Sequence, residues 1–242
     1  MRRSNLIIAS LLIGKKNSSG FPGKNYMDIN GKPSCEYACI ISNEINVDRA
    51  YVSTDSLEIA QIASKYGFKH ISRPAHLATK EALTEDALKH AYDQIVADGK
   101  VDIIVLLFAN NPAISLNLVK QGIKMLSEDE SYDSAFSVCQ YNMFSPIRAR
   151  KIINDEILPF VNLDQFGEIN SIRSSQGDVY FCDLSVQVIR SRVFESMDSQ
   201  PLPFKWQGKK SFPLINNYGF DIDEKWQKVA IEQWLLDHWH EK

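Results

Sequence analysis

The sequence predicts one α/β domain, residues 1–242, built on a doubly wound, mainly parallel sheet. Two continuously apolar runs, 6–12 and 103–107, have the composition of central strands that are covered on both faces. Strand and helix patterns alternate over the first 140 residues, which is typical of parallel sheets flanked by helices on both sides. A chain of 242 residues has the size of one such domain.

Capping residues and glycines set the expected limits of the helices. Ser56, Thr84 and Ser115 stand where N-caps are expected, and Gly67 and Gly99 follow the ends of two helices. The expected elements in chain order are strand 6–12, helix 34–43, strand 50–53, helix 57–66, helix 84–98, strand 103–107, helix 116–126 and strand 135–138.

The pattern weakens between residues 142 and 176, where Pro146 and Pro159 interrupt short apolar pairs. We interpret 142–176 as a small inserted arm or lid. A strand-like stretch, 179–190, then returns to the sheet, and an amphipathic helix over 224–240 closes the domain. Three tryptophans of that helix are expected to form a packing stripe: Trp226, Trp234 and Trp239.

Composition excludes several classes of protein. The net charge of -3 and the isoelectric point near 6.0 provide no broad attraction for nucleic acid or for an anionic membrane. The first apolar run is far shorter than the roughly 20 residues of a membrane span, and no small-residue cleavage site follows it. The four cysteines form no CxxC pair and are expected to be free, buried thiols, so we expect a cytoplasmic protein.

The segment 14–25, directly after the first strand, is rich in glycine, serine and lysine. Glycines let the backbone N–H groups approach a ligand, and lysines supply charge for phosphates. The segment matches neither the P-loop nor the GxGxxG pattern. A solvated surface loop is the alternative, but a position at the carboxyl end of the first strand favours a binding site. The candidate residues are Gly14, Lys15, Ser18, Ser19, Gly20, Lys24 and Asn25.

The closing piece of this loop, Phe21-Pro22-Gly23-Lys24-Asn25, resembles the phosphate loop of the CMP-sialic acid synthetases, the acylneuraminate cytidylyltransferases, and of the related CMP-Kdo synthetases. Further pieces resemble that family in the same order along the chain: 30–33, 52–55, 73–79 and 220–223. The resemblance implies a Rossmann-like nucleotidyltransferase fold. It also implies an enzyme that joins CMP from CTP to an acidic sugar, a nonulosonic acid such as sialic, legionaminic or pseudaminic acid, and releases pyrophosphate.

The resemblance assigns roles to single residues. Lys15, Lys24 and the backbone of 18–20 would contact the triphosphate, Asn25 and Arg73 would lie along the nucleotide, and Thr84 would reach the cytidine. Lys24, Asp221 and Asp223 are the catalytic candidates, and the two aspartates would hold Mg²⁺. The candidates for binding the acceptor sugar are Asn110, Asn111, Gln176 and Asp183, and Asp55 would face the same crevice.

The spacing of Asp221 and Asp223 is compatible with a metal site. On a strand-like segment, side chains two residues apart share a face, and carboxylates are suitable ligands for Mg²⁺. The alternative is that Asp223 caps the last helix, with Glu224 in its first turn, and both descriptions can hold together.

Three departures from the family pattern concern the loop opening and the acceptor half. Lys15 stands where the family has an arginine, residues 108–112 replace its Gln-Pro-Thr-Ser-Pro, and Cys182-Asp183-Leu184 replaces an Asn-Gly pair. Two alternatives therefore stay open: a cytidylyltransferase for another acceptor, and a nucleotide-binding regulatory protein without catalysis. The family often places dimer contacts in the arm, so the resemblance implies a homodimer, and an ordinary lid is the alternative.

Overall fold

The computed structural model describes residues 6–17, 20–219 and 221–239. Within them, a seven-stranded sheet has the order β11-β7-β10-β6-β1-β4-β5. Its strands are β1 (Ile8–Ile13), β4 (Arg49–Thr54), β5 (Lys69–Ser72), β6 (Ile103–Phe108), β7 (Ser134–Gln140), β10 (Tyr180–Arg190) and β11 (Ser211–Asn216). Neighbouring strands are parallel except for β10, which is antiparallel to both β6 and β7. The predicted mainly parallel α/β sheet is confirmed.

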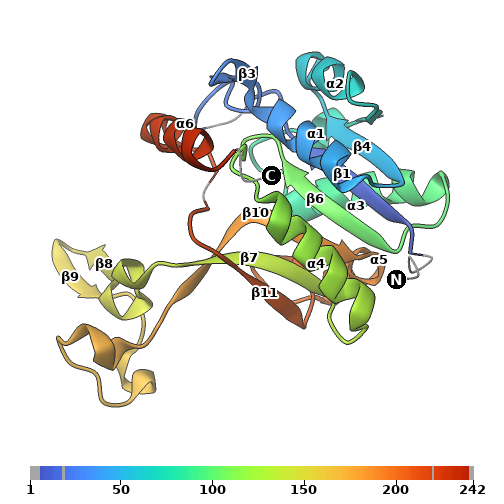
Figure 1. Cartoon of the computed structure of the whole chain (residues 1–242). Coiled ribbons are helices and arrows are strands. Elements are labelled where there is room, and N and C mark those ends of the chain that lie inside the picture. The colour runs from blue at the N-terminus through green and yellow to red at the C-terminus, as the bar shows by residue number, and fades with distance from the viewer. Residues whose placement is uncertain (1–5, 18–19, 220, 240–242) are drawn as a thin grey trace.

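Helices cover both faces of this sheet (Figure 1). One face packs against α1 (Ser34–Ile45), α2 (Leu57–Ser64) and α4 (Leu116–Glu128), and the other against α3 (Thr84–Ala97) and α5 (Ser191–Glu195). Leu12 belongs to the first core and Leu11 to the second, and both side chains are fully buried. Successive side chains of a strand point to opposite faces, which explains why a central strand is apolar throughout.

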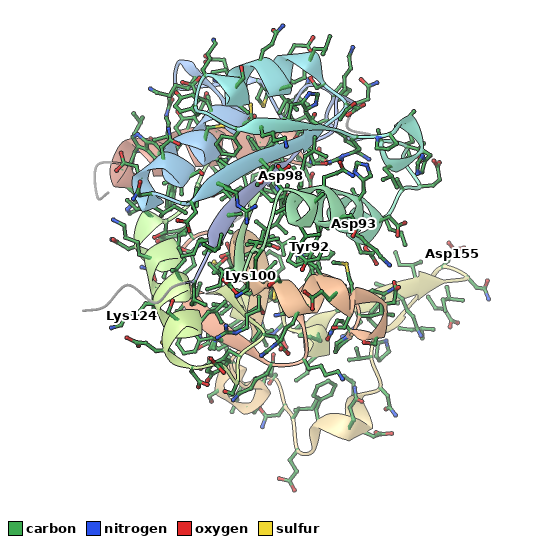
Figure 2. All side chains as sticks on the ribbon, turned by 90° about the vertical axis from the view of Figure 1, so that its right-hand side faces the viewer. Tyr92, Asp93, Asp98, Lys100, Lys124 and Asp155 are labelled. Atoms are coloured by element: carbon green, nitrogen blue, oxygen red, sulfur yellow. The ribbon has the colours of Figure 1, made fainter. Side chains whose placement is uncertain are left out.

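Figure 2 looks onto the face that α3 and α5 cover. Tyr92 of α3 lies between the two helices, where its ring stacks on Phe194 at a centroid distance of 5.1 Å. Its hydroxyl donates a 2.8 Å hydrogen bond to Glu195. The short helix α5 is thus tied to α3 by both apolar and polar contacts.

The helix caps follow the prediction at two of three positions. Ser56 and Ser115 accept hydrogen bonds from the backbone N–H of Ile59 and Leu118. The prediction for Thr84 is wrong: Leu83 is the N-cap of α3 without a side-chain bond, and Thr84 is the first helical residue.

The closing helix α6 (Lys225–His238) packs on a third cluster, which contains Tyr37 of α1 and Ile222. Its N-cap is Glu224 in a capping box with Gln227, so the alternative that Asp223 caps this helix is wrong. Trp234 and Trp239 pack against the cluster, but Trp226 is 65% exposed and does not share the expected stripe.

Residues 142–176 form an arm that projects from the body of the domain (Figure 1). The arm contains a hairpin of β8 (Arg150–Ile153) and β9 (Glu156–Pro159), and Asp155 in its turn lies at the far end (Figure 2). The remaining small elements are β2 (Asp28–Ile29), β3 (Lys32–Pro33) and the 3₁₀ turns Ala75–Leu77, Asn142–Phe144, Pro146–Arg148, Leu163–Phe166, Arg173–Gln176, Met197–Ser199 and Lys205–Gln207.

The four cysteines are free, and burial raises the pKa of the Cys35 thiol to about 12. Across the part of the chain that the structure describes, no helix is long and apolar enough to cross a membrane.

Candidate active site

The site is organised by the end of β1, the third strand from the β5 edge of the sheet, between β4 and β6. Gly14 follows this strand directly, and a Cβ atom there would lie 2.6 Å from the Cβ of Ala109, the residue after β6. The backbone N–H of Ala109 donates a 2.9 Å hydrogen bond to the carbonyl of Ile13. Only a glycine lets the chain turn out of the sheet at this close approach.

The loop that follows is closed by side-chain bonds to its own backbone. Asn25, which is 5% exposed, donates a 2.7 Å hydrogen bond to the carbonyl of Lys15, and Ser34 of α1 donates one of 2.6 Å to the carbonyl of Lys24. Asp55, at the end of β4, accepts a 2.8 Å bond from the N–H of Lys16. The predicted loop residues Ser18 and Ser19 lie outside the described residues.

A cavity of about 330 Å³ opens beside this loop, along the carboxyl ends of the parallel strands. Eight of the predicted residues line it: Gly14, Lys15, Lys24, Asn25, Arg73, Thr84, Asn110 and Asp221. They come from segments that are far apart in the sequence, so the sheet brings them together as expected for a ligand site in an open α/β fold.

Arg73 follows β5 and is buried, with 8% of its surface exposed. Its Nη2 donates a 2.7 Å hydrogen bond to the carbonyl of Ser53, and its backbone N–H bonds the carbonyl of Thr54. Burial lowers the pKa of Arg73, while the charge of Asp55 acts in the opposite direction. The guanidinium stays charged in proteins, so it is a fixed cation on the cavity wall.

Asp221 and Asp223 precede α6, and Asp221 lines the cavity whereas Asp223 does not. The side-chain amide of Asn110 donates a 2.8 Å hydrogen bond to Asp221 and one of 3.3 Å to the carbonyl of Ile222, and the N–H of Ile222 donates to the carbonyl of Asn110. Burial raises the pKa of Asp221, and the nearby negative charge of Asp223 raises it further. Lys24 forms an ion pair with Asp223.

These two carboxylates are the natural donors for a hard cation. The described residues contain no group of three or more His, Cys, Asp or Glu side chains that would hold a metal by themselves. Mg²⁺ is commonly bound by one or two carboxylates together with substrate phosphates and waters. The donor set therefore fits Mg²⁺ that arrives with a phosphorylated ligand. Residues 221–223 are not part of a strand, so the predicted strand geometry is wrong.

Several predicted residues do not line the cavity. Gly20 is exposed beside the carbonyl of Asp223, and the side chain of Asn111 is buried without a hydrogen-bond partner among the described residues. Gln176 lies in the arm, where it accepts a 2.7 Å hydrogen bond from Arg148. Asp183 is buried in the sheet, with 7% exposure, and is bonded to neighbouring strands.

Sequence reasoning missed the apolar wall of the cavity. This wall is formed by Leu184 of β10, by Phe204 and Trp206, and by Phe108. Leu184 has a positive φ of 58°, within an irregularity of β10 between Cys182 and Gln187. The indole N–H of Trp206 donates a 2.7 Å hydrogen bond to Gln187. No periodic pattern marks these residues, although the unmatched Leu184 was a visible departure from the family.

A family model described as cytidylyltransferase matches residues 15–154, which is more than half of the chain. The chain belongs to the cytidylyltransferase family. This confirms the resemblance seen in the loop and in the segments that follow it. The match ends before β10, so it includes Lys24 and Arg73 but neither Asp183 nor Asp221.

Curated relatives match part of the chain at low identity. N-acylneuraminate cytidylyltransferase A of Danio rerio is 26% identical over 144 residues, which are 59% of this chain and 33% of that protein. Pseudaminic acid cytidylyltransferase of Campylobacter jejuni subsp. jejuni is 28% identical over 126 residues, 50% of this chain and 53% of that protein. The chain thus spans between a third and about half of the length of these relatives.

Solved structures share the whole architecture. CMP:2-keto-3-deoxy-manno-octonic acid synthetase in complex with CTP superposes with a TM-score of 0.68 at 15% identity, covering 96% of this chain and 99% of that one. At this identity the likeness establishes the fold, a Rossmann-like nucleotidyltransferase fold, and no more.

Proposed function

We propose that the chain is a Mg²⁺-dependent cytidylyltransferase that joins CMP from CTP to an acidic sugar, a nonulosonic acid, and releases pyrophosphate. One observation carries this proposal. In a chain of the cytidylyltransferase family, the β1 loop, Lys24, Arg73 and Asp221 line one cavity at the carboxyl ends of the parallel strands.

The charged side of the cavity is suited to a nucleoside triphosphate. Lys15 and Lys24 supply two cations at the loop, and Gly14 allows the backbone to approach the phosphates closely. Arg73 and Thr84 extend the same side towards α3, where the nucleoside would lie. Catalysis of phosphoryl transfer is chiefly positioning and neutralisation of charge, which these groups are placed to provide.

The ion pair between Lys24 and Asp223 gives the loop a second role. The side chain of Lys24 is 12% exposed and that of Asp223 is 59% exposed. A triphosphate is a stronger partner for Lys24 than one exposed carboxylate, because it carries several charges and acceptor oxygens. Binding of CTP would therefore draw Lys24 to the phosphates and release Asp223, beside Asp221, to take part in holding the metal.

The two aspartates would hold Mg²⁺ together with phosphate oxygens. The cation would neutralise charge that develops on the phosphates and orient the pyrophosphate leaving group. The protein's own contribution is the direction of the carboxylates: Asn110 holds Asp221 in place through a 2.8 Å hydrogen bond. Asn110 thereby acts as a positioning residue for Asp221.

The apolar wall of Leu184, Phe204 and Trp206 supports a second candidate. It lies across β6 from the nucleotide side, where the acceptor would stand in line with the α-phosphate. Phe108 and Leu184 of this wall stand in the two segments, 108–112 and 182–184, that depart from the family pattern. A cytidylyltransferase for an acceptor other than a nonulosonic acid is therefore the second candidate.

Pyrophosphate release tests both candidates. The full chain is incubated with CTP, Mg²⁺ and, in separate reactions, sialic, legionaminic, pseudaminic and Kdo acids, with UTP and ATP as nucleotide controls. Release with CTP and one nonulosonic acid is expected. Release with Kdo alone would support the second candidate, and thermal stabilisation by CTP without release in any of these reactions would contradict the nonulosonic acid. A folded sample that CTP does not stabilise would contradict both.

The arm supports a proposal about assembly, namely a homodimer. Ile152 and Ile157 are opposite each other in the β8–β9 hairpin, so they share one face, and they are 75% and 73% exposed. Large apolar side chains exposed side by side mark interaction surfaces.

The double substitution of Ile152→Asp with Ile157→Asp should raise the dimer dissociation constant by at least about tenfold. Light scattering across a concentration series measures it, with Lys151→Asp as the control on the same strand. A dimer that survives the double substitution unchanged would contradict this role of the arm.

A further inference from the structure

Asp183 is a buried carboxylate that the proposed chemistry leaves unused. It lies in the irregular part of β10, beside Leu184, and only 7% of its surface is exposed. The irregularity separates the two neighbours: Leu184 lines the cavity, while Asp183 meets the strands β7 and β11. A buried charge is costly unless its surroundings compensate it. The position of Asp183 therefore calls for a physical reason.

Neutral donors satisfy this carboxylate from three strands. Cys139 of β7 donates from its thiol at 3.0 Å, and Ser137 donates from its hydroxyl. Ser185 donates from both its backbone N–H and its hydroxyl at 2.8 Å. Asn216, the last residue of β11, donates from its amide at 3.0 Å. All five of these donors are neutral, so among the described residues these bonds hold the carboxylate in place without a cation.

The carboxylate also supports the chain that leaves β11. Gly219 packs directly against it: a Cβ atom at this position would lie 2.2 Å from Oδ2 and 2.3 Å from Cγ of Asp183. Tyr141 donates a 3.3 Å hydrogen bond to the carbonyl of Gly219. The backbone at Gly219 is therefore confined between the carboxylate of Asp183 and the hydroxyl of Tyr141.

Gly219 stands two residues before Asp221. Before Asp221, the chain is held by the hydrogen bond of Asn216 to Asp183 and by the packing of Gly219 on Asp183. From Asp221 onwards, it is held by the hydrogen bonds that Asn110 donates to Asp221 and Ile222. A displacement at Gly219 would therefore be passed on to the carboxylate of Asp221. A misplacement of about 1 Å in an active site can reduce turnover by about a hundredfold.

We propose that Asp183 is a positioning residue, which fixes the backbone at Asn216 and Gly219 and thereby the direction of Asp221, which lines the cavity, and of Asp223, which follows it. The hydrogen bond from Asn216 and the packing of Gly219 against Asp183 are contacts within the chain and do not depend on any ligand. Only their consequence for metal binding rests on the proposed function.

Hydrogen exchange measured by mass spectrometry tests these contacts without any ligand. Asp183→Asn keeps the size of the side chain but replaces one acceptor oxygen with a donor, which faces the donors of Cys139 and Asn216. Exchange in peptides that cover 216–223 should become about ten to a hundred times faster, the effect of losing one or two bonds to a charged group. Peptides from α1 and β1 should exchange as in the wild type.

Asp133→Asn provides a matched control. Asp133 also accepts backbone bonds, from Lys209 at 2.9 Å and Lys210 at 3.1 Å, and also abuts a glycine, Gly208. It precedes β7, at the end of that strand away from Cys139. Its substitution should speed exchange around 208–210 and leave 216–223 unchanged. If Asp183→Asn does not fold, Gly219→Ala is the second variant. Its added Cβ would collide with the carboxylate of Asp183, so exchange at 216–223 should again become faster.

A second readout concerns the metal. The affinity for Mn²⁺ in the presence of CTP, followed by electron paramagnetic resonance, should fall at least about tenfold in Asp183→Asn and stay unchanged in Asp133→Asn. Wild-type exchange rates at 216–223 in Asp183→Asn, or equal acceleration throughout the sheet, would overturn the positioning role. Two results together would separate the positioning role from the proposed function. If exchange at 216–223 is faster in Asp183→Asn but the wild type binds neither Mn²⁺ nor CTP, the contact with Asp183 is supported and the proposed function is contradicted.

Discussion

The two sides of the cavity are built by different means. The side formed by the β1 loop and the end of β5 is charged and carries Lys15, Lys24 and Arg73. The side formed by β10 and by the 3₁₀ turn Lys205–Gln207 with its N-cap is apolar, with Leu184, Phe204 and Trp206. Lys15, Lys24 and Arg73 fall within the part of the chain that matches the cytidylyltransferase family model, whereas Leu184, Phe204 and Trp206 lie beyond it.

This difference suggests a division of labour. A phosphate-binding side needs glycines and cations at set places whichever sugar is used, because a triphosphate always presents the same charges. An acceptor side is free to change, because its contacts are shape and apolar area. Changes on the charged side should therefore alter turnover and nucleotide affinity, and changes on the apolar side should alter the choice of acceptor.

The largest effect is expected at Asp221. Asp221→Asn removes one carboxylate from the proposed metal site, and turnover should fall by about a hundredfold or more, while the affinity for CTP changes much less. Steady-state pyrophosphate release at saturating Mg²⁺ measures turnover, and thermal shift measures CTP binding. Asp237→Asn on α6, away from the cavity, is the control. Undiminished turnover in Asp221→Asn would remove the metal assignment.

The next effect is expected at Lys24. Lys24→Ala should weaken CTP binding by about ten- to a hundredfold, the effect of losing one hydrogen bond to a charged group. Lys24→Arg keeps the charge and should retain most of the affinity. Titration calorimetry with CTP measures both variants, and Lys65→Ala on the surface after α2 is the control. Equal affinities of Lys24→Ala and wild type would mean that the charged side does not bind the triphosphate.

A smaller and more selective effect is expected at Leu184. Leu184→Asn suits the positive φ of this position while it removes apolar surface, so the protein should remain folded. The KM for the acceptor should rise by about tenfold, and the KM for CTP should stay within a factor of about two. Leu57→Asn, on the exposed first turn of α2, is the control. A parallel rise in both KM values would show that the two sides do not act separately.

The smallest effect concerns stability and pH. Burial and the charge of Asp223 raise the pKa of Asp221 above its unfolded value, so the ionised carboxylate destabilises the metal-free fold. Asp221→Asn should therefore raise Tm without metal near neutral pH, by at most about 4 °C. This gain should shrink as the pH falls through the raised pKa, because the wild-type carboxyl is then neutral as well. Calorimetric scans at several pH values measure the difference. A lower Tm of the variant near neutral pH would show that the hydrogen bond from Asn110 and the charge of Lys24 outweigh the burial.

Local patterns anticipated much of the charged side. The apolar run before Gly14 predicted β1, and the resemblance of segments 73–79 and 220–223 to a known family predicted which residues the sheet would assemble. These signals are readable because each depends on neighbours in the chain: a buried strand, a turn that needs glycine, a helix that needs a cap. Thr84 and Trp226 show where such local predictions fail. A residue type that often caps helices does not have to be the cap, and helical spacing does not show which side chains the fold buries.

The sequence by itself thus determined the α/β class, the loop after β1 and the family to which they belong. Tertiary structure alone decided the antiparallel place of β10, the apolar wall around Leu184 and the contact of Asp183 with Gly219. The physical reason is distance along the chain. A carboxylate that accepts bonds from residues 44 positions before it and 33 after it acquires its role only when three strands meet.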